Sequence, residues 1–380
     1  MSFSSLGLSP SFLKALANAN FLQAYPIQKE AIPAILNKKD VLGIAKTGSG
    51  KTAAFVLPLL MNLKGKPDSK NRHVEILVLV PTRELAIQVN EVFQNFSLAA
   101  FETVKTLAVY GGVSINSQMI ALQNVNILIA TPGRLLELVE SNAVHLSEIG
   151  TLVLDEADKM LNLGFKEEME RIFTLLPKQR QNLLFSATLS DNVNNINQIL
   201  LHDPLVINIE EEANQLELIN QLAYFILDER KGPLLRYLIK NNGSKQVLVF
   251  TSSVYTADHV ADKLRKNGIN ATAIHSKRSQ KARTDALRKF KSGSLQVLVA
   301  TDLLSRGIDI KYLPYVINYE LPRSPKDYVH RIGRTGRADS PGDAITLVTP
   351  DEKHHFKIIQ KKMGQWVSML NGEDIDLKGY

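Results

Sequence analysis

The sequence predicts an α/β protein with two domains, each built on a parallel β-sheet. Its 380 residues correspond to two domains of ordinary size. Short apolar runs alternate with segments of helical periodicity, as in a parallel sheet covered by crossover helices. This alternation of strands and helices is interrupted once, around 209–217, and then resumes. The expected organisation is a first domain at 1–208, a linker at 209–217, a second domain at 218–350 and a short tail at 351–380.

Composition narrows the class of protein. The absence of cysteine excludes disulfides and thiolate metal sites. The first residues lack the basic segment followed by an apolar core that is typical of a secretion signal. No apolar run approaches the roughly 20 residues that span a bilayer. We therefore expect a cytoplasmic monomer with no membrane contact.

The positive charge is concentrated in one half of the chain. Residues 218–350 carry 22 Lys and Arg against 11 Asp and Glu, whereas residues 1–217 carry 18 against 22. An excess confined to one half indicates a polyanion that lies partly on that half.

In the first half, helices are expected at 11–16 and 29–36, and a further helix at 51–63. The expected strands lie at 41–45, 74–80, 103–109, 126–130, 151–154 and 182–185. Each strand ends in a short polar or glycine-bearing segment. Because the carboxyl ends of parallel strands lie at one edge of a sheet, that edge is the expected ligand site.

The second half repeats the alternation. Its expected strands lie at 222–226, 246–251, 271–274, 296–300, 316–319 and 344–348. The helical run at 353–363 is expected to pack on this domain rather than to recognise a ligand. No phosphate loop occurs here, so the halves are expected to share a fold without sharing a chemistry.

The segment Ala45–Thr52 resembles a phosphate loop of Walker A type, with Ala45 in place of the usual first glycine. Glycines let backbone N–H groups converge on phosphate oxygens, and the helix N-terminus adds positive potential. Lys51 is expected to reach the outer phosphates and Thr52 to bind Mg²⁺. The other expected nucleotide contacts of the loop are Thr47, Gly48, Ser49 and Gly50.

Three carboxylates, at Asp155, Glu156 and Asp158, follow the strand at 151–154. Taken alone, this cluster is better interpreted as an acidic turn that caps a helix. With a phosphate loop about a hundred residues upstream, Asp155 is expected to hold Mg²⁺ through water, and Glu156 to orient or deprotonate the attacking water.

Arg334 and Arg337 are candidates for the positive charge that phosphoryl transfer requires. Alone, the segment 330–337 is equally well a surface helix terminus. The second domain has no phosphate loop of its own, so these arginines are interpreted as arginine fingers that enter the nucleotide site of the first domain. Hydrolysis would then depend on domain closure.

Candidates for polyanion contact recur after successive strands. They are Arg83, the Gly111–Gly112 turn, Arg134 and the basic run at 277–291. Each one alone is better explained as solvated surface, but their recurrence favours contacts to phosphates.

Over residues 3–350 the motifs resemble, in order, those of DEAD-box ATP-dependent RNA helicases, and in particular the minimal two-domain core of bacterial members. The matching positions are Gln28, the phosphate loop, 81–86, Gly111–Gly112, 131–134, 155–158, 186–188, 249–251, Gln280 with Arg283, 300–302 with 306–309, and 330–337. Lys46 and Asn20 depart from the usual Gln and Gly.

The resemblance implies two tandem RecA-like domains joined by a flexible linker, with ATP and Mg²⁺ as cofactors. Gln28 would read adenine, Phe3 would stack on it, and Asp309 would contact the ribose. The implied RNA contacts, to the backbone and 2′-hydroxyls, are Arg83, Gly111, Gly112, Thr131, Arg134, Gln280, Arg283 and Thr301. The residues implied to couple the ATP site to RNA and the second domain are Asp158, Ser186, Thr188 and His330.

The expected function is ATP-driven local separation of short RNA duplexes, or remodelling of RNA–protein complexes, with little sequence preference. The short neutral tail carries no polybasic arm, so targeting would come from a protein partner or specificity would be low. The alternatives are a DNA translocase and an ATP-gated RNA clamp with little unwinding. Gln28 and the acidic cluster disfavour the first, and the presence of Lys51, Glu156 and both arginines disfavours the second.

Overall fold

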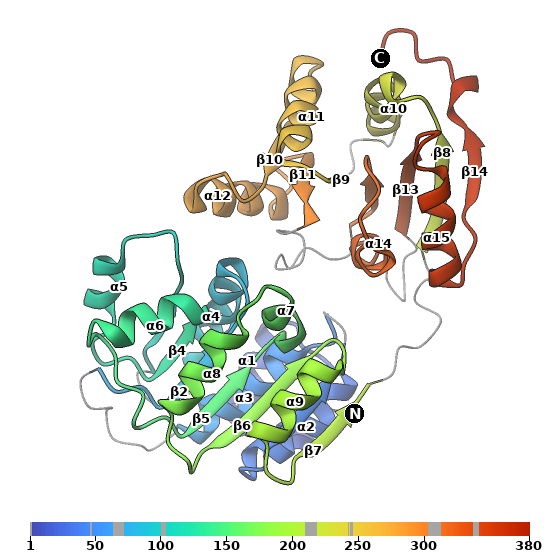
Figure 1. The fold of residues 1–380 in the computed structure, drawn as a ribbon. Coiled ribbons are helices and arrows are strands. Elements are labelled where there is room, and N and C mark those ends of the chain that lie inside the picture. The colour runs from blue at the N-terminus through green and yellow to red at the C-terminus, as the bar shows by residue number, and fades with distance from the viewer. Residues whose placement is uncertain are drawn as a thin grey trace. The chain divides into compact units, whose positions relative to one another are not determined.

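The computed structural model describes residues 2–45, 48–63, 72–99, 104–209, 219–241, 243, 246–302, 313–336 and 342–380. Four residues discussed above, Lys46, Thr47, Asp309 and Arg337, lie outside these ranges. The chain divides into two compact units, Met1–Glu211 and Glu212–Tyr380 (Figure 1). The division falls within the stretch expected as a linker.

The first unit is a parallel sheet covered by helices on both faces (Figure 1). Its strands are β1 (Val41–Ile44), β2 (Ile76–Leu79), β3 (Thr106–Val109), β4 (Ile127–Ala130), β5 (Thr151–Leu154), β6 (Gln181–Ser186) and β7 (Leu205–Asn208). Among the described residues they lie in the order β3-β4-β2-β5-β6-β1-β7, and every pair is parallel.

The helices of this unit alternate with the strands. They are η1 (Phe3–Leu6), α1 (Pro10–Asn18), α2 (Pro26–Leu36), α3 (Lys51–Asn62), α4 (Arg83–Ser97), α5 (Ile115–Ala121), α6 (Pro132–Glu140), α7 (Ala157–Asn162), α8 (Lys166–Thr174) and α9 (Asp191–Leu200).

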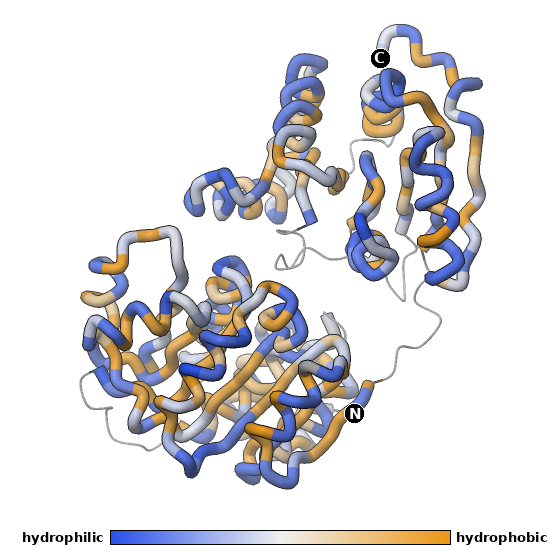
Figure 2. The backbone as a smooth tube through the Cα atoms, in the orientation of Figure 1, coloured by the Kyte–Doolittle hydropathy of each residue, from blue (hydrophilic) through white to orange (hydrophobic). Residues whose placement is uncertain are grey.

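The central strands are apolar on both faces because each face is covered. On β6, Leu183 and Phe185 enter the core that holds α2, α3 and α4, whereas Leu184 enters the core on the opposite face. Figure 2 shows these strands as an apolar interior. On β1, a Cβ at Gly43 would lie 2.6 Å from the Phe185 ring, so this strand needs glycine where the ring packs.

The second unit repeats this architecture. Its strands are β8 (Ile219–Phe225), β9 (Val247–Thr251), β10 (Ala271–Ile274), β11 (Val297–Thr301), β12 (Tyr315–Asn318), β13 (Gly342–Val348) and β14 (Ser368–Asn371). Where the chain is described, they form one parallel sheet in the order β10-β11-β9-β12-β13-β8-β14.

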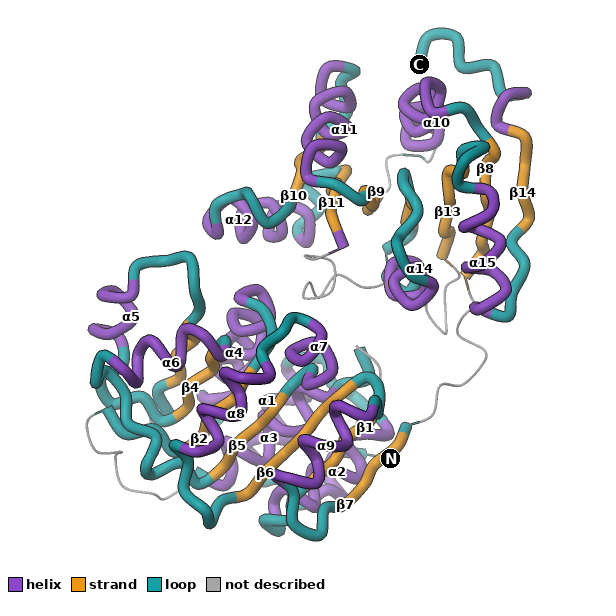
Figure 3. Tube along the Cα trace, viewed as in Figure 1, coloured by secondary structure: helices purple, strands orange, loops and turns teal. Residues whose placement is uncertain are grey.

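The helices of the second unit are α10 (Asp228–Asn241), α11 (Val254–Lys266), α12 (Gln280–Lys291), α14 (Pro325–Ile332), α15 (Lys353–Met363) and η3 (Gly372–Asp374). Figure 3 shows how they alternate with the strands. Within the described ranges, no helix is long and apolar enough to cross a membrane.

The structure confirms the predicted α/β class with two parallel sheets, and each predicted strand is present with small differences at its ends. The sequence analysis missed β7 and β14. Both are edge strands. All four residues of β14 are exposed and two of them are polar, whereas β7 carries the short apolar run Leu205–Ile207, which the sequence analysis overlooked. The predicted start of the second helix was wrong, because Pro26 occupies the first turn and the helix begins there rather than at residue 29.

The segment 351–380 adds α15 and β14 to the second unit. Glu373 accepts hydrogen bonds from the Arg230 guanidinium (2.6 Å) and from the Leu227 N–H (2.9 Å). Tyr380 packs edge-on against Tyr237, with ring centroids 5.2 Å apart. These contacts fasten the end of the chain to α10.

Candidate active site

Three of the predicted motifs meet at one edge of the first sheet. Strands β5, β6 and β1 are consecutive neighbours in that sheet and run parallel. The acidic cluster, the segment 186–188 and the phosphate loop follow their carboxyl ends. The strand order therefore brings together chemistry that is more than a hundred residues apart in the sequence.

The phosphate loop ends in left-handed backbone. Gly48 and Gly50 have φ of 95° and 89°, which glycine adopts without strain. Gly50 occupies the N-cap of the 12-residue helix α3 and has no side chain that could accept hydrogen bonds from the first turn. The N–H groups of a helix N-terminus and the helix dipole suit an anion such as phosphate.

Lys51 is buried at the start of α3, and its ammonium donates to the carbonyl of Ala45. Burial lowers the pKa of Lys51, and the carboxylates of Asp155 and Glu156 oppose that shift. The ammonium therefore lies at the acidic cluster in a place with little water, where a phosphate would be a strong partner.

Gln28 supports the loop. It is fully buried in the first turn of α2, its Oε1 accepts from the Tyr25 N–H (2.9 Å), and its Nε2 donates to the Gly50 carbonyl (3.1 Å). A Cβ at Gly50 would lie 2.5 Å from Gln28 Nε2. Gln28 thus contacts the nucleotide loop directly, while its contact with adenine stays a prediction. Phe3 is buried in the apolar core, so its stacking on adenine also stays a prediction.

Asp155 continues the β5 ladder, since its N–H donates to the Leu79 carbonyl (3.0 Å). The side chain is 2 % exposed, and Oδ1 has no hydrogen-bond partner among the described residues. Burial raises the pKa of the Asp155 carboxyl to about 7, the Glu156 carboxylate adds to the rise, and Lys51 opposes it. A buried acceptor without a partner fits a hard cation such as Mg²⁺.

Glu156 has left-handed backbone, with φ 56° and ψ 47°, at the start of α7. This conformation costs a non-glycine residue about 1 kcal/mol, and such strain is found mainly at functional sites. Its Oε2 forms an ion pair with Lys159 Nζ at 2.7 Å, and both side chains are buried. The sequence analysis missed Lys159, although the spacing of three residues on a helix could have indicated it.

Asp158 connects the acidic cluster to the end of β6. Its Oδ2 accepts from the Thr188 hydroxyl (3.0 Å), and the Ser186 hydroxyl donates to the Thr188 carbonyl (2.8 Å). The structure thus brings together the three residues of this unit that were expected to couple the ATP site to RNA and the second domain.

Arg83 and Arg134 both lie close to the Gly111–Gly112 turn. A Cβ at Gly112, where φ is 81°, would lie 2.1 Å from Arg83 Nη1. Arg134 is buried, its Nη2 donates to the Val113 carbonyl (3.1 Å), and its Nε pairs with Glu137 (2.8 Å). In this structure Arg134 therefore shapes the turn.

Two further residues belong to this edge. Thr131 is buried at the start of α6. Gln118, which the sequence analysis missed, donates to the Tyr110 carbonyl (3.0 Å) and fixes the other side of the glycine turn.

In the second unit, Arg283 is buried on α12 and donates to Gln280 Oε1. Thr301 ends β11, His330 lies on α14, and Arg334 follows that helix and is buried. Sequence analysis missed Arg331, the most buried charged residue of this helix.

Comparisons with known proteins agree with this arrangement. A family model described as DEAD/DEAH box helicase matches residues 25–196, and one described as Helicase conserved C-terminal domain matches residues 230–339. The chain is 41 % identical to "ATP-dependent RNA helicase CshA" of Listeria monocytogenes, over 94 % of this chain and 68 % of that protein. It is 39 % identical to "DEAD-box ATP-dependent RNA helicase CshA" of Geobacillus kaustophilus, over 95 % of this chain and 77 % of that protein.

Two solved structures extend the comparison. A DEAD box protein of Methanococcus jannaschii matches with 36 % identity and a TM-score of 0.57, covering 98 % of this chain and 99 % of that one. Dbp5 of S. cerevisiae, bound to RNA and ADP BeF3, matches with 29 % identity and a TM-score of 0.84, covering 98 % and 96 %.

Proposed function

We propose that this chain, which belongs to the family of DEAD/DEAH box helicases, is an ATP-dependent RNA helicase and hydrolyses ATP to ADP and phosphate when RNA is bound. It separates short RNA duplexes or remodels RNA–protein complexes. The observation that carries the proposal is the meeting of the phosphate loop, the acidic cluster and the segment 186–188 at one edge of the first sheet.

The residues of the first unit fit a nucleotide with Mg²⁺. Thr52 and Asp155 would hold the cation, whose charge would neutralise the outer phosphates. The N–H groups at the start of α3 bind phosphate oxygens. The Lys51 ammonium, which donates to the Ala45 carbonyl in the described structure, donates to a phosphate oxygen instead. Gln28 fixes the loop through Gly50 and reads the adenine edge.

Glu156 orients the attacking water and accepts its proton. In the described structure its carboxylate is paired with Lys159, so this ion pair must loosen before the carboxylate can act. From the second unit, Arg334 and Arg337 supply positive charge to the transition state, and Asp309 contacts the ribose.

RNA is held through its backbone. Arg83, Gly111, Gly112, Thr131 and Arg134 form the contact set of the first unit, with Arg134 acting through the turn that it shapes. Gln280, Arg283 and Thr301 contribute from the second unit, and His330 joins Asp158, Ser186 and Thr188 in coupling RNA to ATP. The excess positive charge of residues 218–350 suits a polyanion. We place the protein in the cytoplasm as a monomer, with a partner protein or ribonucleoprotein as target.

The proposal is tested with purified protein, ATP and a short RNA duplex. ATP hydrolysis is expected to rise when RNA is added, and the strands to separate only when ATP is present. The change Glu156→Gln is expected to leave ATP and RNA binding in place and to lower turnover by about a hundredfold or more. Glu140→Gln is the control, because Glu140 pairs with Arg171 on the exposed surface.

Three outcomes would contradict the proposal. Equal stimulation by duplex DNA would favour a translocase, and tight ATP-dependent RNA binding without strand separation would favour a clamp. Near-normal turnover by Glu156→Gln would remove this residue from the water-orienting role.

A further inference from the structure

The first turns of α11 carry an exposed aromatic pair that has no role in the proposed function. Tyr255 is 79 % exposed, more than any other large apolar side chain in the described part of the second unit. Its ring lies nearly parallel to the ring of His259, which is also exposed, with centroids 6.1 Å apart and 12° between the planes. The pair therefore presents a flat aromatic surface to solvent, on which another ring can stack.

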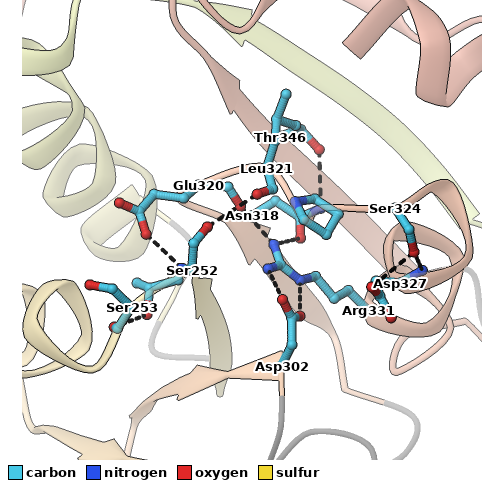
Figure 4. Close-up of polar contacts among 12 residues, drawn as sticks. Ser252, Ser253, Asp302, Asn318, Glu320, Leu321, Ser324, Asp327, Arg331 and Thr346 are labelled. Atoms are coloured by element: carbon cyan, nitrogen blue, oxygen red, sulfur yellow. Dashed lines mark hydrogen bonds and ion pairs between the residues drawn. The ribbon is translucent and has the colours of Figure 1, made fainter. Parts of the chain in front are cut away.

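The start of α11 is held firmly at the end of β9. Glu320 accepts hydrogen bonds from the Ser252 N–H (2.6 Å) and from the Thr256 hydroxyl (3.1 Å). Figure 4 shows Glu320 beside Ser252. Ser253 caps the helix, since its hydroxyl accepts from the Thr256 N–H (3.0 Å). The backbone that carries Tyr255 is thus ordered before any ligand binds, which lowers the entropic cost of binding.

An arginine is held next to the helix turn that carries Tyr255. Asp258 lies three residues after Tyr255 on α11, so the two side chains are neighbours on the helix surface. Asp258 Oδ1 accepts from Arg278 Nη2 (2.5 Å) and lies 3.0 Å from Nε2 of the buried His275. The Arg278 side chain is 44 % exposed. Because a guanidinium carries five N–H donors, an exposed one can bind a carboxylate and a phosphate together.

These residues lie at the sheet edge to which the proposed function assigns RNA. Strands β10, β11 and β9 are consecutive neighbours and run parallel, so the segments after their carboxyl ends adjoin. The segment 275–279 follows β10 and leads into Gln280 and Arg283, Thr301 ends β11, and α11 follows β9. The aromatic pair and Arg278 therefore border the proposed RNA contacts of this unit.

We propose that the start of α11 is a second RNA subsite, in which Tyr255 stacks on an unpaired base and Arg278 binds a neighbouring phosphate. Stacking on an aromatic ring is open to every base, so it adds affinity without sequence preference. Bases inside a duplex are stacked on one another, so the subsite selects RNA with a single-stranded extension. This inference rests on the proposed function, because that function assigns RNA to Gln280 and Arg283.

The stacking is tested with the full chain and a fluorescein-labelled single-stranded oligouridine, by fluorescence anisotropy over a range of salt concentrations. Tyr255→Leu removes the aromatic ring and should raise Kd by about fivefold or more, without a change in the salt dependence. Tyr255→Phe keeps the ring and should bind within about twofold of the wild type. On an abasic oligomer of the same length, Tyr255→Leu should bind as the wild type does. The control is Trp366→Leu, which removes another exposed ring of this unit.

The phosphate contact has a different signature. Arg278→Gln should raise Kd on both oligomers, and should lower the slope of log Kd against log salt concentration by about 1, because one phosphate contact is lost. The control is Arg288→Gln at the other end of α12. Arg288 is exposed and pairs with Asp285 at 2.5 Å, much as Arg278 pairs with Asp258. Its loss should leave both Kd and the slope unchanged.

Each outcome decides a different point. Unchanged oligouridine affinity of Tyr255→Leu would overturn the stacking, because the ring pair would then only stabilise α11. An equal loss on the abasic oligomer would overturn it as well, because no base would be involved. An unchanged salt slope in Arg278→Gln would overturn the phosphate contact. Absence of RNA binding by the wild-type protein would instead reject the proposed function.

Discussion

Replacing Asp155 with Asn is expected to make the nucleotide-free protein more stable at neutral and alkaline pH. The Asp155 carboxyl is buried, and one of its oxygens has no hydrogen-bond partner among the described residues. An ionised carboxylate in such a place is unfavourable, whereas a neutral amide of the same shape avoids most of that cost.

The size of the effect follows from the pKa of this group. The pKa rises from 3.8 to about 7 on folding, mainly through burial, and such a difference corresponds to at most roughly 4 kcal/mol of unfolding free energy. Because the folded carboxyl binds its proton more tightly than the unfolded one, wild-type stability falls as pH rises from about 4 to about 7. The gain from Asp155→Asn should therefore be small near pH 4 and complete near pH 8.

The assay is hydrogen exchange of the β5 and β6 amides in the full chain, between pH 5 and pH 8. Trp366, the only tryptophan, belongs to the second unit, so its fluorescence would report on the wrong part of the protein. Asp158→Asn is the control and should lower stability, because that carboxylate accepts hydrogen bonds from Thr188 and the Lys159 N–H.

A second arm tests the link to the cation. Mg²⁺ with ATP should reduce the advantage of Asp155→Asn, because a bound cation removes the cost of the ionised carboxylate. A stability difference that does not change with pH would refute the assignment of the cost to ionisation at Asp155.

Three other changes probe the same edge of the first unit. Lys159→Met should lower stability by about 3 kcal/mol, because it leaves Glu156 buried without its partner, and a second change, Glu156→Gln, should restore most of the loss in thermal unfolding. Gly112→Ala should weaken RNA binding in fluorescence anisotropy, because φ is 81° at this position and an added Cβ would displace the Arg83 guanidinium, whereas at Gly111 nothing lies within 4 Å of an added Cβ. Gln28→Ala should lower ATP affinity in titration calorimetry and reduce the preference for ATP over GTP, because the hydrogen bond from Gln28 to the Gly50 carbonyl of the loop is lost.

Each of these results has a counterpart that would contradict it. Full stability of Lys159→Met would mean that the ion pair contributes nothing in solution. Equal RNA affinity of the alanine variants at 111 and 112 would remove the glycine turn from the RNA site. Unchanged discrimination between ATP and GTP would separate Gln28 from adenine recognition.

The sequence predicts well the central strands and the position of the motifs at their carboxyl ends, because both depend on local patterns. A strand such as β5 is buried on both faces, so a short apolar run is enough to identify it. The edge strand β14 exposes all four side chains and lacks that pattern, whereas β7 carries three consecutive apolar residues that could have indicated it. Their pairing with β1 and β8 depends on contacts that are remote in the sequence.

Charged residues show the limit of sequence analysis more clearly. Arg134 was expected to bind RNA, and Arg331 was missed. Both are buried, and each donates to an acceptor from another segment, Arg134 to the Val113 carbonyl and Arg331 to the Asp302 carboxylate. Lysine and arginine are usually solvated, so composition alone assigns them to the surface. Only the contacts of Arg134 with Val113 and of Arg331 with Asp302 show that these side chains hold loops inside their own unit.

The left-handed turn at Glu156 explains why two adjacent carboxylates have different surroundings. Asp155 still belongs to the sheet, since its N–H donates to Leu79, and its side chain is therefore held in the protein interior. The turn at Glu156 ends the strand and starts α7, which places Lys159 one helical turn later, beside the Glu156 carboxylate. One oxygen of the Asp155 carboxyl thus has no hydrogen-bond partner among the described residues, which suits a cation, whereas the Glu156 carboxylate is paired with Lys159. About 1 kcal/mol of backbone strain is the cost of this separation.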